Sequence, residues 1–203
     1  MIAPRYDRPH LSLIQKNLPG WNVDLYIGGR EAVSTPSLLE QNGIKVIVNC
    51  AVNFDVDLVG AQQPAEDGRI PSGPGFLRYY KLGLVDGPGN ADTMLLAGYY
   101  ILRGALDQTF PDKPSYPHRD KGNVLVNCRA GRSRSVSLVA LFLHLEMPEL
   151  YPTLASAIDH IRDKRELHPD EWFETPKPEL IGAVERAADM IRLIEAKKDR
   201  AVA

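Results

Sequence analysis

Residues 124–143 read VLVNCRAGRSRSVSLVALFL, and they contain the strongest indication of the fold in the sequence. An apolar run is followed by a turn with one glycine and three arginines, and then by a long apolar segment. We expect a buried strand at 123–128 and a central helix from about 133. A strand that feeds a helix through such a turn directs backbone N–H groups and the helix N-terminus at one place, which attracts an anion.

Cys128 is the first residue of that turn. The pKa of a thiol near arginines or a helix N-terminus falls from about 8.5 to between about 3.5 and 7.5, so Cys128 is expected to be a thiolate nucleophile at neutral pH. The planar guanidinium of Arg134 matches two phosphate oxygens. Gly131 permits a conformation that other residues disfavour, and we expect the Ser135 hydroxyl to bond the sulfur. The alternative is an inert, buried core thiol at Cys128.

The rest of the chain alternates between strand and helix patterns. Apolar runs predict strands at 23–29, 44–51 and 76–86, and helical spacing predicts helices near 36–42, 91–108, 153–165 and 178–198, with a long surface loop at 52–75. This alternation predicts an α/β fold with a central, mostly parallel sheet flanked by helices. We expect a single domain at 21–197, a loose N-terminal extension at 1–20 and a C-terminal tail at 198–203.

Composition excludes several classes of function. The formal net charge is −2, so we expect no nucleic-acid partner. No run of 18 apolar residues or secretory signal is present, so no integral membrane segment is expected. The two cysteines, Cys50 and Cys128, are too few for a disulfide framework, which favours the cytoplasm. The five histidines are scattered, so neither a metal nor another cofactor is expected.

The turn also resembles a known motif. Cys128, five residues, then Arg134 and Ser135 resemble the C-x5-R-S phosphate loop of the cysteine-dependent protein tyrosine phosphatase superfamily, and of its dual-specificity branch in particular. The segments LYIGG (25–29), LGLVDGPGN (82–90) and AIDHIRDKRELHP (157–169) are similar to that branch as well, so the resemblance covers roughly 22–185. It implies a dual-specificity phosphatase-like fold and hydrolysis of phosphate monoesters through a cysteinyl-phosphate.

The resemblance also implies a role for each site residue. The loop residues that bind the substrate phosphate are Arg129, Ala130, Gly131, Arg132, Ser133 and Arg134. Asp86 corresponds to the general acid, and its alternative interpretation is a plain turn aspartate. Asp92 is a competing candidate, although a charge at a helix N-terminus explains it as well.

Three positions raise separate questions. The family has a histidine before the nucleophile, and Asn127 stands there instead, so we expect a higher thiol pKa than in the relatives. Asp170 replaces an asparagine, and we assign it no role in bracing the loop. Cys50 matches a cysteine that in some relatives forms a disulfide with the nucleophile under oxidation, and the alternative is a small core residue.

The substrate is left open by the sequence. The predicted partner is a phosphorylated protein, or alternatively a phospholipid or small-molecule phosphate. The loop CRAGRSRS is similar to CKAGRSRS of the mitochondrial phosphatidylglycerophosphate phosphatase, and basic residues at Arg129 and Arg132 suit a polyanionic head group such as that of a phosphoinositide. These arginines could instead bond neighbouring acidic residues. A non-catalytic phosphate-binding module is the third interpretation.

Overall fold

The computed structural model describes residues 6–58, 73–116 and 118–202. Its sheet has the strand order β1-β2-β5-β3-β4. The strands are β1 (Leu11–Gln15), β2 (Leu25–Gly28), β3 (Ile44–Ala51), β4 (Arg78–Leu84) and β5 (Asn123–Asn127). β1 pairs antiparallel with β2, whereas β2–β5, β5–β3 and β3–β4 are parallel. The predicted α/β fold with a mostly parallel sheet is confirmed.

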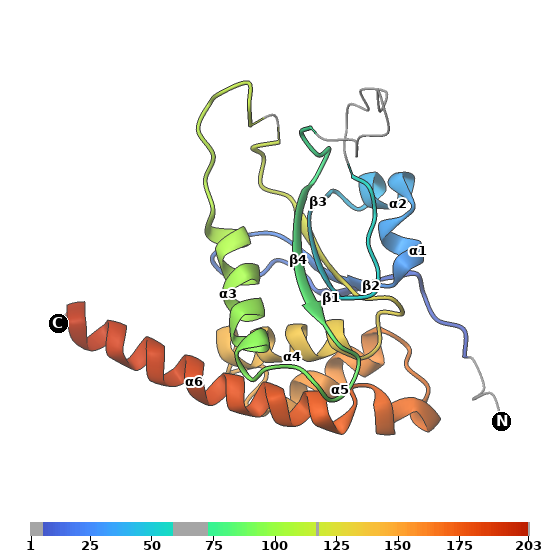
Figure 1. Ribbon diagram of the computed structural model, residues 1–203, viewed down its shortest axis with the longest axis vertical. Coiled ribbons are helices and arrows are strands. Elements are labelled where there is room, and N and C mark those ends of the chain that lie inside the picture. The colour runs from blue at the N-terminus through green and yellow to red at the C-terminus, as the bar shows by residue number, and fades with distance from the viewer. Residues whose placement is uncertain (1–5, 59–72, 117, 203) are drawn as a thin grey trace.

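Helices cover both faces of this sheet (Figure 1). They are α1 (Arg30–Val33), α2 (Pro36–Gln41), α3 (Thr93–Asp107), α4 (Arg134–Glu146), α5 (Leu154–Lys164), the 3-10 helix η2 (Pro169–Glu174) and α6 (Pro178–Val202). The short helices α1 and α2 pack on one face, and α3 to α6 pack on the other. Among the described residues, none of the helices combines the length and the apolarity needed to cross a membrane.

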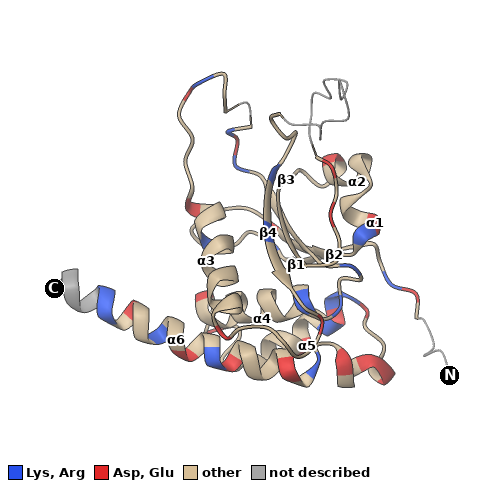
Figure 2. Ribbon diagram, in the orientation of Figure 1, with Lys and Arg blue, Asp and Glu red and all other residues tan. Residues whose placement is uncertain are grey.

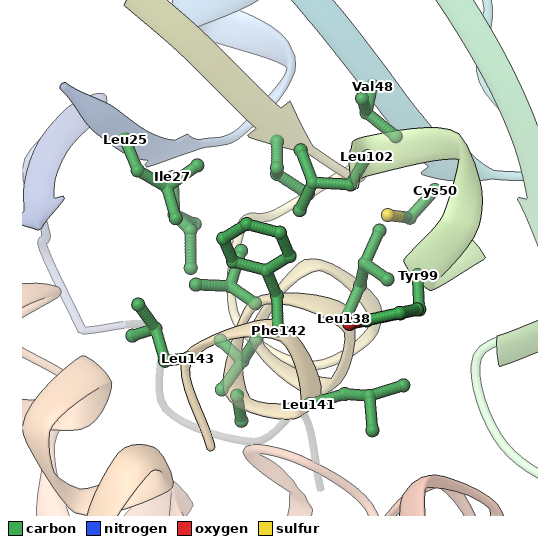
Figure 3. Close-up of a cluster of buried hydrophobic side chains, with 14 of the residues drawn as sticks. Leu25, Ile27, Val48, Cys50, Tyr99, Leu102, Leu138, Leu141, Phe142 and Leu143 are labelled. Carbon is green, nitrogen blue, oxygen red and sulfur yellow. The ribbon is translucent and has the colours of Figure 1, made fainter. Parts of the chain in front are cut away.

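The core forms because alternate side chains of each strand point to opposite faces of the sheet. Val48 and Cys50 join the large cluster under α3 and α4, whereas Ile47 joins the smaller cluster under α1 and α2. Helix α4 is central, with every residue from Arg134 to Leu143 buried. Figure 3 shows Phe142 and Leu138 of this helix among the strand side chains. Each such fully buried apolar side chain contributes about 1.5–3 kcal/mol.

Regular elements lie within both of the predicted terminal segments. Residues Leu11–Gln15 form the edge strand β1, because alternate positions pack inward and leave Ile14 only 2% exposed. At the other end, α6 continues to Val202, past the predicted boundary at 197. Figure 2 shows charges of both signs along α6, and its Arg186 pairs with Asp92 before α3. Residues 59–72 of the predicted long loop lie outside the described residues.

Candidate active site

The turn after β5 surrounds the sulfur of Cys128 with hydrogen-bond donors. The backbone N–H of Gly131 donates to Sγ at 3.2 Å, and the Ser135 hydroxyl oxygen lies 3.4 Å from the sulfur. Ser135 is in the first turn of α4, so the helix N-terminus faces the thiol. Cys128, Gly131 and Ser135, which are close in sequence, are therefore also brought together around one atom in space.

The surroundings of Cys128 favour its thiolate. The residue is only 2% exposed, and this burial raises the pKa of the thiol. Hydrogen bonds from the Ser135 side chain and backbone, the charge of Arg134 and a backbone hydrogen bond from Ala130 outweigh burial, so the net pKa of Cys128 lies below its usual value. A buried thiolate held by several donors is a nucleophile prepared for an electrophilic centre.

Gly131 allows the turn to pack directly against β2. Its φ is +66°, in the left-handed region that favours glycine. A Cβ at this position would lie 2.6 Å from the Gly28 carbonyl oxygen and 2.9 Å from Nη2 of Arg165. Arg165, which is 1% exposed, donates from Nε to the Gly131 carbonyl at 3.0 Å. Burial and the nearby charge of Arg8 lower the pKa of Arg165 to about 10, so Arg165 remains charged at neutral pH.

Arg134 is held at one end of its guanidinium and unsatisfied at the other. Its Nη1 donates to Oδ1 of Asn53 at 2.9 Å and to the Leu84 carbonyl at 3.1 Å. Within the described residues, its Nε is buried and has no hydrogen-bond partner. A buried N–H of a charged group without an acceptor is costly, and an anion bound in the loop would satisfy it. Asn53 was not predicted, because its segment has no readable pattern.

Asp86 lies two residues after Leu84, and thus next to the strand end that contacts Arg134. It is exposed, and in the part of the chain that the structure describes its carboxylate has no hydrogen-bond or ion-pair partner. Asn90 closes the segment 85–90 on itself: its side chain accepts from the Val85 N–H and donates to the carbonyls of Val85 and Gly87. The carboxylate of Asp86 is thus available to a bound substrate.

Asp92 has a different environment. Its Oδ1 lies 2.7 Å from Nη2 of Arg186, and this ion pair joins the start of α3 to α6. This ion pair agrees with the alternative interpretation of Asp92 as a structural charge.

The comparisons with known proteins agree with this arrangement. No protein-family model and no curated protein matches the sequence. Solved structures do match: human DUSP28 has a TM-score of 0.57 at 21% identity, covering 91% of this chain and 96% of that one. The Yvh1 phosphatase domain from Chaetomium thermophilum has a TM-score of 0.61 at 16% identity, covering 89% and 96%. The human tyrosine phosphatase-like serine/threonine/tyrosine-interacting protein has a TM-score of 0.54 at 20% identity, covering 88% and 97%.

The chain has the dual-specificity phosphatase fold. Within that fold, the segment from Cys128 to Arg134, here called the phosphate loop after the motif that its sequence resembles, is the turn that joins β5 to α4. The described residues contain no group of three or more His, Cys, Asp or Glu side chains arranged to hold a metal ion.

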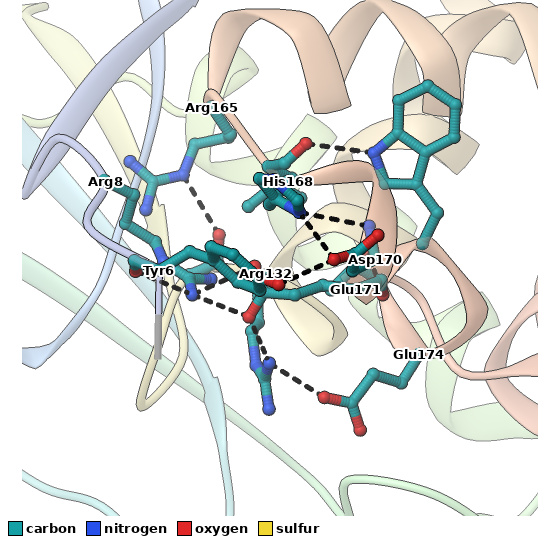
Figure 4. A network of polar contacts seen from close by, with 12 residues as sticks. Tyr6, Arg8, Arg132, Arg165, His168, Asp170, Glu171 and Glu174 are labelled. Atoms are coloured by element: carbon teal, nitrogen blue, oxygen red, sulfur yellow. Dashed lines mark hydrogen bonds and ion pairs between the residues drawn. The ribbon is translucent and has the colours of Figure 1, made fainter. Parts of the chain in front are cut away.

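In this dual-specificity phosphatase fold, η2 and the N-terminal segment brace the phosphate loop (Figure 4). Arg132 Nη1 lies 2.7 Å from Glu171 and 2.8 Å from Glu174, and Arg8 lies 2.9 Å from Glu171. Asp170 accepts from the Tyr6 hydroxyl instead, and among the described residues no hydrogen bond or ion pair joins it to the loop. The sequence did not predict a role for Glu171, which follows Asp170, the residue that the family resemblance singled out.

The two arginines inside the loop differ in environment. The charge of Arg132 is balanced by Glu171 and Glu174. This agrees with the alternative, given in the sequence analysis, that a loop arginine bonds acidic residues. The Arg129 side chain is exposed, and within the described ranges it has no ion-pair partner. Arg129 is thus the loop cation that faces solvent.

Asn127 and Cys50 lie beneath the loop. Asn127 is fully buried, its Nδ2 is 3.5 Å from the Cys128 carbonyl, and its Oδ1 has no partner among the described residues. The pairing of Asn49 with Asn127 places Cys50 and Cys128 at the ends of neighbouring strands, in the same buried cluster. Burial and the negative charge of Cys128 raise the pKa of Cys50, which is a free thiol. Its disulfide with Cys128 stays a prediction.

Proposed function

We propose that this protein is a cysteine-dependent phosphatase that hydrolyses phosphate monoesters, with phosphorylated Tyr, Ser and Thr side chains of proteins as its substrates. One observation carries the proposal: the sulfur of Cys128, which Gly131 and Ser135 contact, and the Nε of Arg134, which has no partner among the described residues, belong to one loop at the N-terminus of α4. The dual-specificity phosphatase fold of the whole chain supports it.

The chemistry proceeds in two steps. The Cys128 thiolate attacks phosphorus, so that a sulfur–phosphorus bond forms as the ester oxygen–phosphorus bond breaks. Asp86 gives its proton to the leaving oxygen. Water then attacks the cysteinyl-phosphate, Asp86 takes a proton from that water, and inorganic phosphate leaves as the thiolate is restored. The Ser135 hydroxyl, 3.4 Å from the sulfur, stabilises the thiolate as a leaving group.

The loop supplies the electrostatic stabilisation. The backbone N–H groups of 129–134 and the guanidinium of Arg134 bind the equatorial oxygens, where negative charge is concentrated in the transition state. Asn53 and the Leu84 carbonyl fix Nη1 of Arg134, so that little reorganisation accompanies the reaction.

The environment of the two loop arginines favours a phosphoprotein over a polyanionic lipid. Arg132 is paired with two glutamates, which leaves one uncompensated loop cation, Arg129, to meet charge beyond the transferred phosphate. The exposed Arg129 is the observation that favours the second candidate, a phosphoinositide or phosphatidylglycerophosphate phosphatase.

Hydrolysis of p-nitrophenyl phosphate tests the activity. We expect turnover by the wild type, and a loss of at least about a thousandfold in Cys128→Ser, because the hydroxyl is a far weaker nucleophile than the thiolate. Cys50→Ser is the matched control, and it should retain most of the activity. A wild type that binds phosphate without hydrolysing this ester would instead support the non-catalytic phosphate-binding module.

A substrate panel then decides the class. Phosphopeptides, phosphoinositides and phosphatidylglycerophosphate are compared by kcat/KM on wild type and on Arg129→Gln. We expect the highest values on phosphopeptides. Preference for a lipid, abolished by Arg129→Gln, would contradict the protein assignment and support the second candidate.

A further inference from the structure

We propose that Lys177 is a positioning residue for the general acid, an inference that rests on the proposed function. Its Nζ donates to the backbone carbonyl of Asp86 at 3.0 Å. Lys177 is 91 residues away in sequence, at the junction of η2 and α6. The contact fixes the backbone that carries the carboxylate and leaves the carboxylate itself unengaged.

The main chain of Lys177 is held in place by hydrogen bonds. Its backbone N–H donates to the hydroxyl of Ser133, a buried residue of the phosphate loop, at 3.4 Å. Its carbonyl accepts from the N–H groups of Leu180 and Ile181 in the first turn of α6. One residue therefore contacts both halves of the site: its main chain bonds the loop that binds phosphate, and its side chain bonds the segment that carries the acid.

The segment 85–90 needs such an anchor. Its glycines Gly87 and Gly89 have φ values of +138° and +98°, which are unfavourable for other residues. Because glycine can adopt many other backbone conformations, the glycines alone do not fix the shape of the segment. The bonds from Asn90 are internal to the segment. Across the described residues, Lys177 supplies the hydrogen bond that ties 85–90 to another part of the molecule. Its aliphatic stem also covers Gly87, where an added Cβ would lie 3.8 Å from Cδ.

A residue that only positions an acid leaves a kinetic signature. A proton from Asp86 matters most when the leaving alcohol is a strong base, and much less when the leaving group is a stable anion such as p-nitrophenolate. Loss of the anchor should thus reduce kcat for poor leaving groups and change KM little, because phosphate binding by the loop is retained.

The test compares Lys177→Met, Lys177→Arg and the control Lys164→Met, which removes an exposed lysine of α5. We expect Lys177→Met to lower kcat for phenyl phosphate by about 10-fold or more and for p-nitrophenyl phosphate by less than about 3-fold. Lys177→Arg should recover part of the loss. In an Asp86→Asn background, Lys177→Met should have no further effect, since the group that it positions is gone.

A second readout does not depend on turnover. Amide hydrogen exchange of 85–90 should be faster in Lys177→Met than in wild type, with exchange in α4 unchanged. Equal losses for all leaving groups, full additivity with Asp86→Asn, or unchanged exchange would overturn the inference while leaving Cys128-dependent hydrolysis intact. A wild type without that hydrolysis would overturn the proposed function, and this inference with it.

Discussion

Two opposed effects act on the pKa of the Cys128 thiol. Burial disfavours its charge, while Ser135, Arg134 and the loop backbone favour it, and the balance lowers the pKa. Above that pKa the group is a thiolate, and below it the group is a thiol that reacts slowly with electrophiles. Inactivation by iodoacetate should therefore set in at a lower pH than alkylation of an ordinary cysteine.

Ser135→Ala tests this balance at a single atom. The change removes the hydroxyl 3.4 Å from the sulfur, so the pKa of Cys128 should rise and the inactivation profile should move to higher pH. Below the wild-type pKa, we expect inactivation to be about 10-fold slower, because a hydrogen bond to a charged group is worth about 1.5 kcal/mol or more. The control is Ser137→Ala, which removes a hydroxyl that donates to the Ser133 carbonyl. Identical profiles for Ser135→Ala and wild type would contradict the assignment.

At the scale of single residues, the sequence predicted the residues of the motif but not the distant residues that contact them. Cys128, Gly131 and Ser135 meet because they are neighbours along the chain, so spacing alone placed them. Asn53 contacts Arg134 across 81 residues, and Glu171 contacts Arg132 across 39. Such pairs depend on how distant elements pack, and one sequence contains no signal for them.

At the scale of the elements, η2 contacts the phosphate loop through ion pairs with Arg132. Its Glu171 is 5% exposed and binds two arginines, Arg8 from the N-terminal segment and Arg132 from the loop. One carboxylate therefore joins three segments that are far apart in the chain. Loss of this charge leaves two guanidinium groups without their shared partner.

Glu171→Gln should consequently lower the free energy of unfolding by about 3 kcal/mol, measured by urea denaturation. Glu174→Gln is the matched control, since Glu174 is more exposed and contacts Arg132 but not Arg8, and we expect a loss below about 1 kcal/mol. If the two variants were equally stable, Glu171 would not be the residue that joins these segments.

The elements themselves were predictable where the hydrophobic pattern is strong. The strand expected at 44–51 is β3 without any change of boundary. The strand β1 was missed because five residues at an edge give a weak alternation, and because its antiparallel pairing with β2 depends on the rest of the sheet. The helix η2 was also missed, since a 3-10 helix of six residues has no amphipathic period to detect.

In the molecule as a whole, the parallel strands bring the parts of the site to one edge of the sheet. Strands β3, β4 and β5 end next to one another, and the segments that follow them supply Asn53, Asp86 and Cys128. Glu171 of η2 contacts Arg132 of the phosphate loop, and Lys177, the residue before α6, contacts the backbone of Asp86. The fold thus brings segments that are far apart in the sequence to the edge of the sheet where Cys128 lies.

Trapping of the phosphoenzyme tests whether Cys128 is the nucleophile. Wild-type protein is mixed with p-nitrophenyl phosphate, quenched in acid during turnover, and mapped by peptide mass spectrometry. We expect one phosphoryl group on the peptide that contains Cys128. Turnover with the phosphoryl group on another residue, or with Cys128→Ser as active as wild type, would contradict it.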